Sequence, residues 1–139
     1  MQPTPKCDVL DNFGDPRSGG RSHEGVDIMA TNGQPIYAVA NGVLTRQSRA
    51  GEANASLSGN SWVLAQTDGT YFMYAHLSGF AAGLSVGSRV VVGQVIGYVG
   101  DTGNPGAGNY HLHFEFHPNG GAAINSLPLL AIPPGCHVY

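Results

Sequence analysis

Residues 61–77 read SWVLAQTDGTYFMYAHL, and this stretch carries the clearest signal of the fold. Two runs rich in β-branched and aromatic residues, 61–67 and 70–77, flank the dipeptide Asp68-Gly69. Asp-Gly between two such runs is typical of a tight turn that joins antiparallel strands. The stretch therefore predicts a β-hairpin.

On both sides of this hairpin, short apolar runs alternate with turns rich in glycine and proline. Residues 34–46 surround Asn41-Gly42, a turn signal, and predict either a second hairpin or one long kinked strand. Further strands are expected at residues 89–92, 94–100 and 110–117. The other segments are expected to be loops, apart from one helical turn at 79–84: 1–22, 47–60, 101–109 and 118–139.

The composition of the 139-residue chain agrees with a small β-domain rich in turns. It contains 21 glycines, and each glycine inside a helix costs about 1 kcal/mol relative to alanine, which argues against a helical bundle. Hydrophobic residues make up 42%, enough for a core and too many for a disordered tail. We expect an all-β fold, a single compact antiparallel β-sandwich-like domain with minimal helix and a groove between loops. Its core spans about 13–117, between an N-terminal arm at 1–12 and a C-terminal tail at 118–139.

Charge and hydropathy argue against two classes of partner. The formal net charge is −3, Lys6 is the only lysine, and the arginines are scattered, so no basic stripe marks a nucleic-acid surface. The chain has no polybasic patch for anionic lipid and no run of about 18 apolar residues. We expect no nucleic acid and no membrane as partners, and we expect a monomer.

The two cysteines, Cys7 and Cys136, lie near opposite ends of the chain, too far apart for a local metal motif. They form either a disulfide that ties both termini of an exported domain or two unrelated buried thiols. A disulfide that closes so long a loop stabilises by about 4–5 kcal/mol in the chain-entropy model. Residues 1–6 lack the apolar segment of an export signal, so we expect a mature or trimmed form of an exported protein, periplasmic, wall-bound or extracellular.

The spacing of the histidines is informative. His111 and His113 are two residues apart on an expected strand, where alternate side chains share a face. Glu115 and His117 share that face, and the apolar residues between them point the opposite way into a core. By itself, this pattern is either a metal-binding pair or a solvent-facing polar row.

A second group is His23 and Asp27, in the segment HEGVD. Gly25 disfavours a helix, and in an extended segment the even spacing puts both side chains on one face. Two histidines and one aspartate are good Zn²⁺ ligands and leave a fourth position for water, the pattern of a catalytic zinc site. His76 ends the hairpin stretch, where functional groups often lie. Taken separately, the first pair is also consistent with a surface ion pair, and His76 with a buried or edge histidine.

Taken in order, HxxxD at 23–27, YAHLS at 74–78 and HLHFE at 111–115 resemble the motifs of the lysostaphin-type zinc metallopeptidases, the LytM or M23 peptidase family. Three longer segments are also similar to that family: FGDPRSGGRSHEGVDIMA, QPIYAVANGVL and VGSRVVVGQVIGYVGDTG. The resemblance extends from about Phe13 to Phe116.

The resemblance implies a zinc endopeptidase in which every motif position is filled. It implies that His23, Asp27 and His113 bind one Zn²⁺ per chain and that His76 and His111 are the two catalytic histidines. The family cleaves peptides of bacterial peptidoglycan, in cross-links or stem peptides, or Gly-rich peptides, through a metal-activated water. Because the sequence has no HExxH glutamate to act as the base, a histidine must take the proton.

Two further residues, Glu115 and Tyr74, are candidates for contacts at the site. Glu115 is either a hydrogen-bond partner of a ligand histidine or a solvated carboxylate, and Tyr74 either contacts substrate or packs in the core. Some relatives cover their zinc with an upstream asparagine. Asn12 is the only asparagine close upstream of the first motif, and we expect an open site. His117 and His137 match no family motif.

Two other classes are weighed against the peptidase. Some relatives have lost ligands and act as non-catalytic wall-binding or hydrolase-activator modules of the same fold, and the intact ligand set argues against this alternative. Residues 84–100 also resemble the glycine-kinked hairpins of lipoyl and biotinyl carrier domains. A carrier needs a lysine in an exposed turn, whereas Lys6 lies in the N-terminal arm.

Overall fold

The predicted hairpin lies at the centre of the fold. In the computed structural model, which describes residues 7–130 and 136–139, β5 (Asn60–Ala65) pairs antiparallel with β6 (Tyr71–Phe80). The backbone N–H of Thr70 donates to the Asp68 carboxylate at 2.9 Å, and Gly69 has a φ of 90°, a left-handed value that favours glycine. The hairpin and its turn are therefore confirmed.

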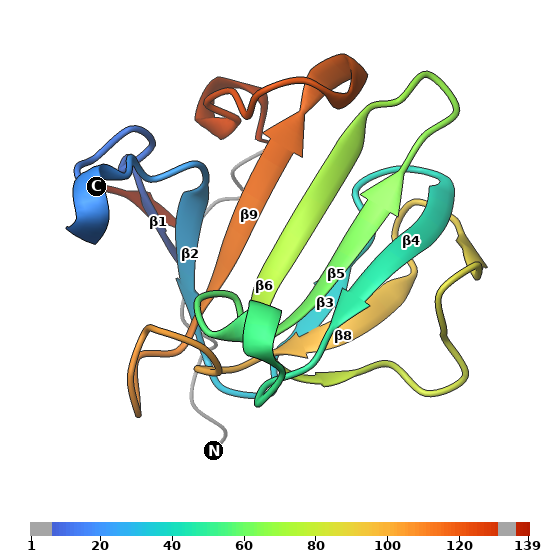
Figure 1. Ribbon diagram of the computed structural model, residues 1–139, viewed down its shortest axis with the longest axis horizontal. Helices are drawn as coiled ribbons and strands as arrows, with labels where there is room; N and C mark the ends of the chain where they lie inside the picture. The colour runs from blue at the N-terminus through green and yellow to red at the C-terminus, as the bar shows by residue number, and fades with distance from the viewer. Residues whose placement is uncertain (1–6, 131–135) are drawn as a thin grey trace.

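Within the described residues, ten strands form one open sheet, which confirms the all-β class (Figure 1). The strands outside the hairpin are β1 (Cys7–Leu10), β2 (Val26–Ala30), β3 (Pro35–Tyr37), β4 (Gly42–Ser48), β7 (Arg89–Val90), β8 (Val95–Val99), β9 (His111–His117) and β10 (His137–Val138). The order is β10-β1-β2-β9-β6-β5-β4-β7, and β8 pairs with both β6 and β3. The pairing is antiparallel except between β1 and β10.

Helix is limited to four short 3-10 segments in the described part of the chain. They are η1 (Ser18–Gly20), η2 (Ala53–Ala55), η3 (Pro118–Gly120) and η4 (Leu127–Leu129). None of the helices found there is long and apolar enough to cross a membrane. The expectation of minimal helix is confirmed.

The core lies between the central hairpin and the β3–β8 pair, which passes behind it in Figure 1. Trp62 is fully buried, and its indole N–H donates to the carbonyl of Ile96 at 2.8 Å. Apolar side chains from both layers surround it: Ile36, Leu44, Leu64, Leu77 and Val99. This packing gives the molecule its sandwich-like layering.

The segment at residues 34–46 forms neither a hairpin nor one strand. β3 pairs with β8, and β4 pairs with β5 and β7 instead. The side-chain oxygen of Asn41 accepts a hydrogen bond from the backbone of Val92 at 2.8 Å. This contact ties the Asn41-Gly42 turn to a distant loop, so tertiary pairing overrides the local turn signal.

Three other local expectations are corrected. Residues 1–22 and 118–139 are not loop throughout, because Cys7–Leu10 forms a strand on β2 and His137–Val138 forms a strand on β1. The helical turn expected at 79–84 is wrong, because β6 continues to Phe80, which pairs with Gly97 of β8. Long-range strand pairing determines the structure of all three segments.

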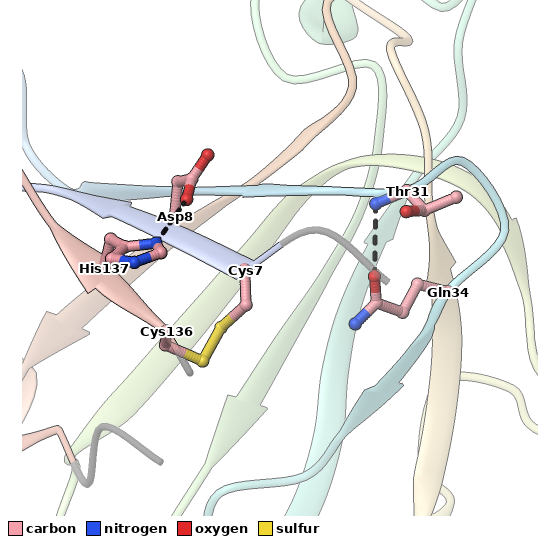
Figure 2. Close-up of a disulfide and its surroundings, with 6 residues drawn as sticks. All are labelled: Cys7, Asp8, Thr31, Gln34, Cys136 and His137. Atoms are coloured by element: carbon pink, nitrogen blue, oxygen red, sulfur yellow. Dashed lines mark hydrogen bonds and ion pairs between the residues drawn. A yellow bond between two sulfur atoms is a disulfide. The ribbon is translucent and has the colours of Figure 1, made fainter. Parts of the chain in front are cut away.

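Cys7 and Cys136 form a disulfide, which confirms the first of the two alternatives for the cysteines (Figure 2). The bond joins the beginnings of the neighbouring strands β1 and β10 across a sequence separation of 129 residues. It therefore closes the sheet edge that contains both ends of the described chain. Lys6 of the expected arm and Pro133 and Pro134 of the expected tail lie outside the described residues.

β9 is the strand that positions the functional side chains. It lies between β2 and β6, with His113 opposite Asp27 on one side and Ala75 on the other. Its histidines and Glu115 face a groove, whereas Phe114 is buried in the core. The expected alternation of faces is confirmed.

Candidate metal centre

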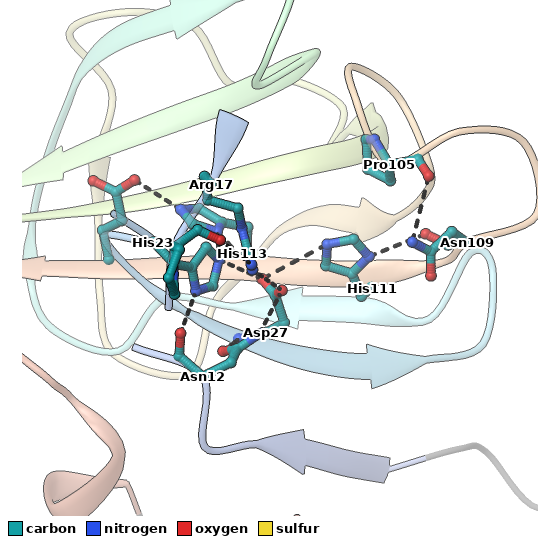
Figure 3. A network of polar contacts seen from close by, with 10 residues as sticks. Asn12, Arg17, His23, Asp27, Pro105, Asn109, His111 and His113 are labelled. Atoms are coloured by element: carbon teal, nitrogen blue, oxygen red, sulfur yellow. Dashed lines mark hydrogen bonds and ion pairs between the residues drawn. The ribbon is translucent and has the colours of Figure 1, made fainter. Parts of the chain in front are cut away.

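Three side chains from two adjacent strands and the loop before them converge at one point (Figure 3). The Nε2 atom of His23 lies 3.1 Å from Nδ1 of His113 and 3.2 Å from Oδ1 of Asp27. The same aspartate oxygen lies 3.2 Å from His113 Nδ1. In residues 7–130 and 136–139, these side chains form the one group of three or more that could hold a metal ion.

The triangle fits a tetrahedral zinc ion. Ligand atoms bound at about 2.0–2.1 Å in a tetrahedron are about 3.3–3.4 Å from one another. The three observed separations of 3.1–3.2 Å are close to that value. Two imidazoles and one carboxylate also leave the fourth position for water or substrate.

Each ligand histidine donates its other ring N–H to an oxygen that can only accept. His23 Nδ1 is 3.0 Å from the backbone oxygen of Asn12, and His113 Nε2 is 2.7 Å from Glu115 Oε2. The outer nitrogen of each ring therefore carries a proton, and the inner nitrogen is the one that would bind a metal ion. Such outer partners orient metal-ligating histidines.

Asn12 holds the third ligand and was assigned no such role from the sequence. Its side-chain amide donates to Oδ2 of Asp27 at 2.9 Å, and its side-chain oxygen accepts from the Asp27 backbone at 3.3 Å. These bonds fix the carboxylate from behind and leave Oδ1 directed at the two histidines. Nearness to the first motif was the only sequence signal for this residue.

The charges of the site favour a cation. Burial alone would raise the pKa of Asp27, but the adjacent imidazole rings of His113, His23 and His111 hold it far below the usual range. Burial alone would lower the pKa of His113, but the carboxylates of Asp27 and Glu115 raise it to about 9. A proton or a metal ion is therefore strongly stabilised between these side chains.

Two further histidines lie beside the triangle. The rings of His76 and His111 are 4.8 Å apart, and His111 Nε2 lies 3.7 Å from Asp27 Oδ1. His76 Nδ1 is 2.8 Å from the carbonyl oxygen of Thr102, and His111 Nδ1 is 3.0 Å from that of Asn109. Because a carbonyl only accepts, both rings carry a proton on Nδ1, which directs Nε2 of each ring towards the site.

His76 is held in an unusual state by its surroundings. Burial lowers its pKa to about 4, with a further contribution from His111, so the ring is neutral at neutral pH. Its backbone has a φ of 68°, and such left-handed non-glycine residues cost about 1–3 kcal/mol and cluster at active sites. The surrounding contacts must therefore maintain this conformation.

Hydrogen bonds and a close backbone contact join the 47–60 loop to the 101–109 loop beside these histidines. Thr102 Oγ1 donates to the carbonyl of Leu77 at 2.8 Å and accepts from the backbone of Asn60 at 3.1 Å. A Cβ atom on Gly59 would lie 2.4 Å from the Thr102 carbonyl carbon, so only glycine permits this approach. The contact fixes the Thr102 carbonyl that orients His76.

The site opens into a groove of about 790 Å³. The groove is lined by the sheet face that bears the histidines, by Asn54 and Leu57 of the 47–60 loop, and by Asn104 and Pro105 of the 101–109 loop. The groove between loops that the sequence predicts is therefore present. A volume of this size is typical of ligand-binding clefts.

Among the remaining candidates, the structure brings Glu115 into the site and places Tyr74 elsewhere. Glu115 contacts His113, as one of its two interpretations required. Tyr74 is 1% exposed in the core, and its hydroxyl accepts a hydrogen bond from the backbone of Val39 at 3.0 Å. Its burial agrees with the second of its two interpretations, core packing, because Tyr71, Met73 and Ala75 of β6 line the groove whereas Tyr74 belongs to the core.

Comparison with known proteins gives a consistent result. The sequence profile described as Peptidase family M23 matches residues 21–126. The DD-carboxypeptidase/endopeptidase Mpg of Neisseria meningitidis is 38% identical over 100 residues, which are 72% of this chain and 21% of that protein. The L-Ala--D-Glu endopeptidase of Bacillus subtilis is 38% identical over 118 residues, covering 78% of this chain and 34% of that protein. The chain thus spans about a fifth to a third of the length of these curated relatives.

The fold is also similar to solved structures. The catalytic domain of the antimicrobial peptidase lysostaphin from Staphylococcus simulans superimposes with a TM-score of 0.70 at 31% identity. The match covers 87% of this chain and 90% of that domain. Sequence and fold therefore both relate this chain to peptidases. The matched residues 21–126 include all five candidate side chains: His23, Asp27, His76, His111 and His113.

Proposed function

We propose that this chain, which belongs to peptidase family M23, is a zinc-dependent endopeptidase that hydrolyses peptide bonds of bacterial peptidoglycan. One observation carries the proposal: the His23, Asp27 and His113 ligand atoms lie 3.1–3.2 Å apart beside the rings of His76 and His111. The coarser part, kinship with peptidoglycan endopeptidases, rests on the family itself.

The ligand triangle would hold one Zn²⁺, which polarises the scissile carbonyl and makes a water molecule more acidic when it is bound. Histidine side chains of the chain then transfer the protons of the reaction. Nε2 of His76 or His111 accepts the proton that the attacking water loses. The imidazolium formed in this way stabilises the negative charge that develops on the carbonyl oxygen, and the other histidine ring lies beside it. The proton taken up is delivered to the leaving amine, so no proton is gained or lost overall.

The groove supports a peptide substrate. The relatives include a DD-carboxypeptidase/endopeptidase, an L-Ala--D-Glu endopeptidase and a glycyl-glycine endopeptidase. We propose that the substrate is a peptide of this class, in a cross-link, a stem or a Gly-rich segment.

The disulfide supports an exported location for this enzyme. Cys7 and Cys136 are bonded, and disulfides persist mainly in oxidising compartments. We place the domain in the periplasm, the cell wall or the medium, where peptidoglycan is accessible.

Lysis of purified peptidoglycan tests the proposal. A chelator should abolish lysis and Zn²⁺ should restore it, and lysis that survives complete zinc removal would refute the ligand assignment. Two variants separate the roles of the side chains. D27N should lose both zinc and activity, whereas H111A should lose activity and keep stoichiometric zinc. Loss of zinc from H111A would show that the two histidines of HLH have exchanged roles.

A further inference from the structure

His117 is a buried histidine that the proposed reaction does not use. It ends β9 on the groove face, four residues after the ligand His113, and is 7% exposed. Its Nε2 atom lies 2.7 Å from Glu115 Oε1, and its Nδ1 atom lies 2.9 Å from the carbonyl oxygen of Gly121. Both ring nitrogens are therefore engaged.

Glu115 connects this histidine to the metal centre. One carboxylate oxygen, Oε2, accepts from Nε2 of His113 at 2.7 Å, and the other, Oε1, accepts from His117. A continuous chain of short hydrogen bonds thus runs from the Gly121 carbonyl through His117 and Glu115 to His113. All three side chains are largely buried. A solvent-facing polar row would not have this arrangement.

The direction of these bonds determines what each group contributes. The Gly121 carbonyl can only accept, and a carboxylate that accepts from both neighbours is ionised. The short contact of His117 Nε2 gives Glu115 Oε1 a fixed hydrogen-bond partner, and this contact sets the orientation of the carboxylate. His113 is left to donate from Nε2, which directs the lone pair of its Nδ1 at Asp27 and His23.

The far end of the chain is also fixed. The ring of Tyr71 stacks on His117 with centroids 4.2 Å apart and planes within 11°. The Gly121 carbonyl belongs to the turn after β9, in which the Gly121 N–H donates to Pro118 at 3.1 Å. The Asn119 backbone donates to Thr70 Oγ1 of the central hairpin at 3.0 Å. The acceptor for His117 is thus attached to the rigid centre of the sheet.

We infer that His117 is a positioning residue of the metal centre: through Glu115 it fixes the ring and the tautomer of His113 for zinc binding. The inference rests on the proposed function, because it takes His113 as a zinc ligand. It extends that function to a residue that matches no family motif. Outer partners of this kind change metal affinity without touching the ion.

Zinc affinity, measured by competition with a chelating dye, tests this role. H117F keeps an aromatic ring on Tyr71 but has no donor, and it should bind zinc about tenfold more weakly or worse. H117Q keeps a donor for Glu115 and should stay within about threefold of the wild type. The matched control is H137F, at a histidine that is 69% exposed on β10, and its affinity should not change.

Several outcomes are decisive. Wild-type zinc affinity in H117F, or equal losses in H117F and H117Q, would overturn the positioning role. Failure of the wild-type chain to bind zinc would instead refute the proposed function. A second measurement does not depend on how the variants fold. In proton NMR spectra of the wild-type protein, the ring N–H groups that bond to Glu115 should exchange slowly with solvent, and fast exchange would contradict the inference.

Discussion

Replacement of Gly25 by alanine should weaken zinc binding, because the added methyl group would clash with the ring of His113. Gly25 lies between the ligands of the first motif and is buried against β9. A Cβ atom there would lie 2.6 Å from the Phe114 carbonyl oxygen and 2.8 Å from Cε1 of His113. Its φ lies outside the left-handed region, so the backbone itself accepts alanine and the effect must come from the new atom.

The size of the effect follows from these distances. Carbon atoms pack at about 3.5 Å or more, so the His113 ring must move by about 0.7 Å unless the strands separate. Zinc–ligand distances tolerate only about 0.2 Å. Movement of the His113 ring also disturbs its hydrogen bond to Glu115. Loss of such a hydrogen-bond partner lowers metal affinity by about 10–100-fold, and we expect a fall in zinc affinity of that size. Overpacking should also lower the free energy of unfolding by about 1–3 kcal/mol.

The assay compares two glycine-to-alanine variants. Gly79 on β6 also lacks a left-handed φ, and a Cβ atom there would have no neighbour within 4 Å. G79A should keep the wild-type zinc affinity and change the free energy of unfolding by less than about 0.5 kcal/mol. Urea unfolding of the chelator-treated proteins and dye competition for zinc give the two quantities. If G25A binds zinc like G79A, the inferred position of His113 is wrong.

Three other predictions concern the scaffold and the charge of the site. The double variant C7S/C136S should lose about 5 kcal/mol of unfolding free energy for a 129-residue separation, and a loss below about 1 kcal/mol in urea would contradict a role in closing the sheet edge. In chelator-treated protein, folding raises the pKa of His113 from 6.5 to about 9, so its stabilising contribution is complete below pH 6.5 and is lost as the pH rises towards 9. The urea-derived stability should fall across that window by up to roughly 3 kcal/mol, and a rise would be inconsistent with the pairing to Asp27 and Glu115. Y74F should lose about 1–3 kcal/mol of stability because a buried backbone donor loses its acceptor, and a drop in the turnover of folded Y74F would restore a substrate contact for this residue.

The sequence predicts the parts of this fold that depend on local periodicity and turn chemistry. Asp68-Gly69 between two β-rich runs is sufficient for the central hairpin. The two-residue period of β9 correctly separates the groove-facing His111 and His113 from the core. The sequence does not predict the separation of β3 from β4, because the contact of Asn41 with Val92 is between loops about fifty residues apart.

The outer contacts of the site are harder to predict for a physical reason. Their acceptors are mostly backbone carbonyls, such as that of Asn12 for His23 and that of Gly121 for His117. Every residue carries a carbonyl, so no residue type marks the one that strand register brings into place. The role of His117 becomes visible only in the structure, where one oxygen of Glu115 contacts His113 and the other contacts His117.

Dependence of peptide-bond cleavage on zinc occupancy tests the central claim most directly. Metal-free protein is titrated with Zn²⁺ while new amino groups released from purified peptidoglycan are counted. The His23, Asp27 and His113 centre predicts no release without zinc, a linear rise with added metal, and saturation at one equivalent per chain. Release from the metal-free protein, or none at one bound equivalent, would contradict the account.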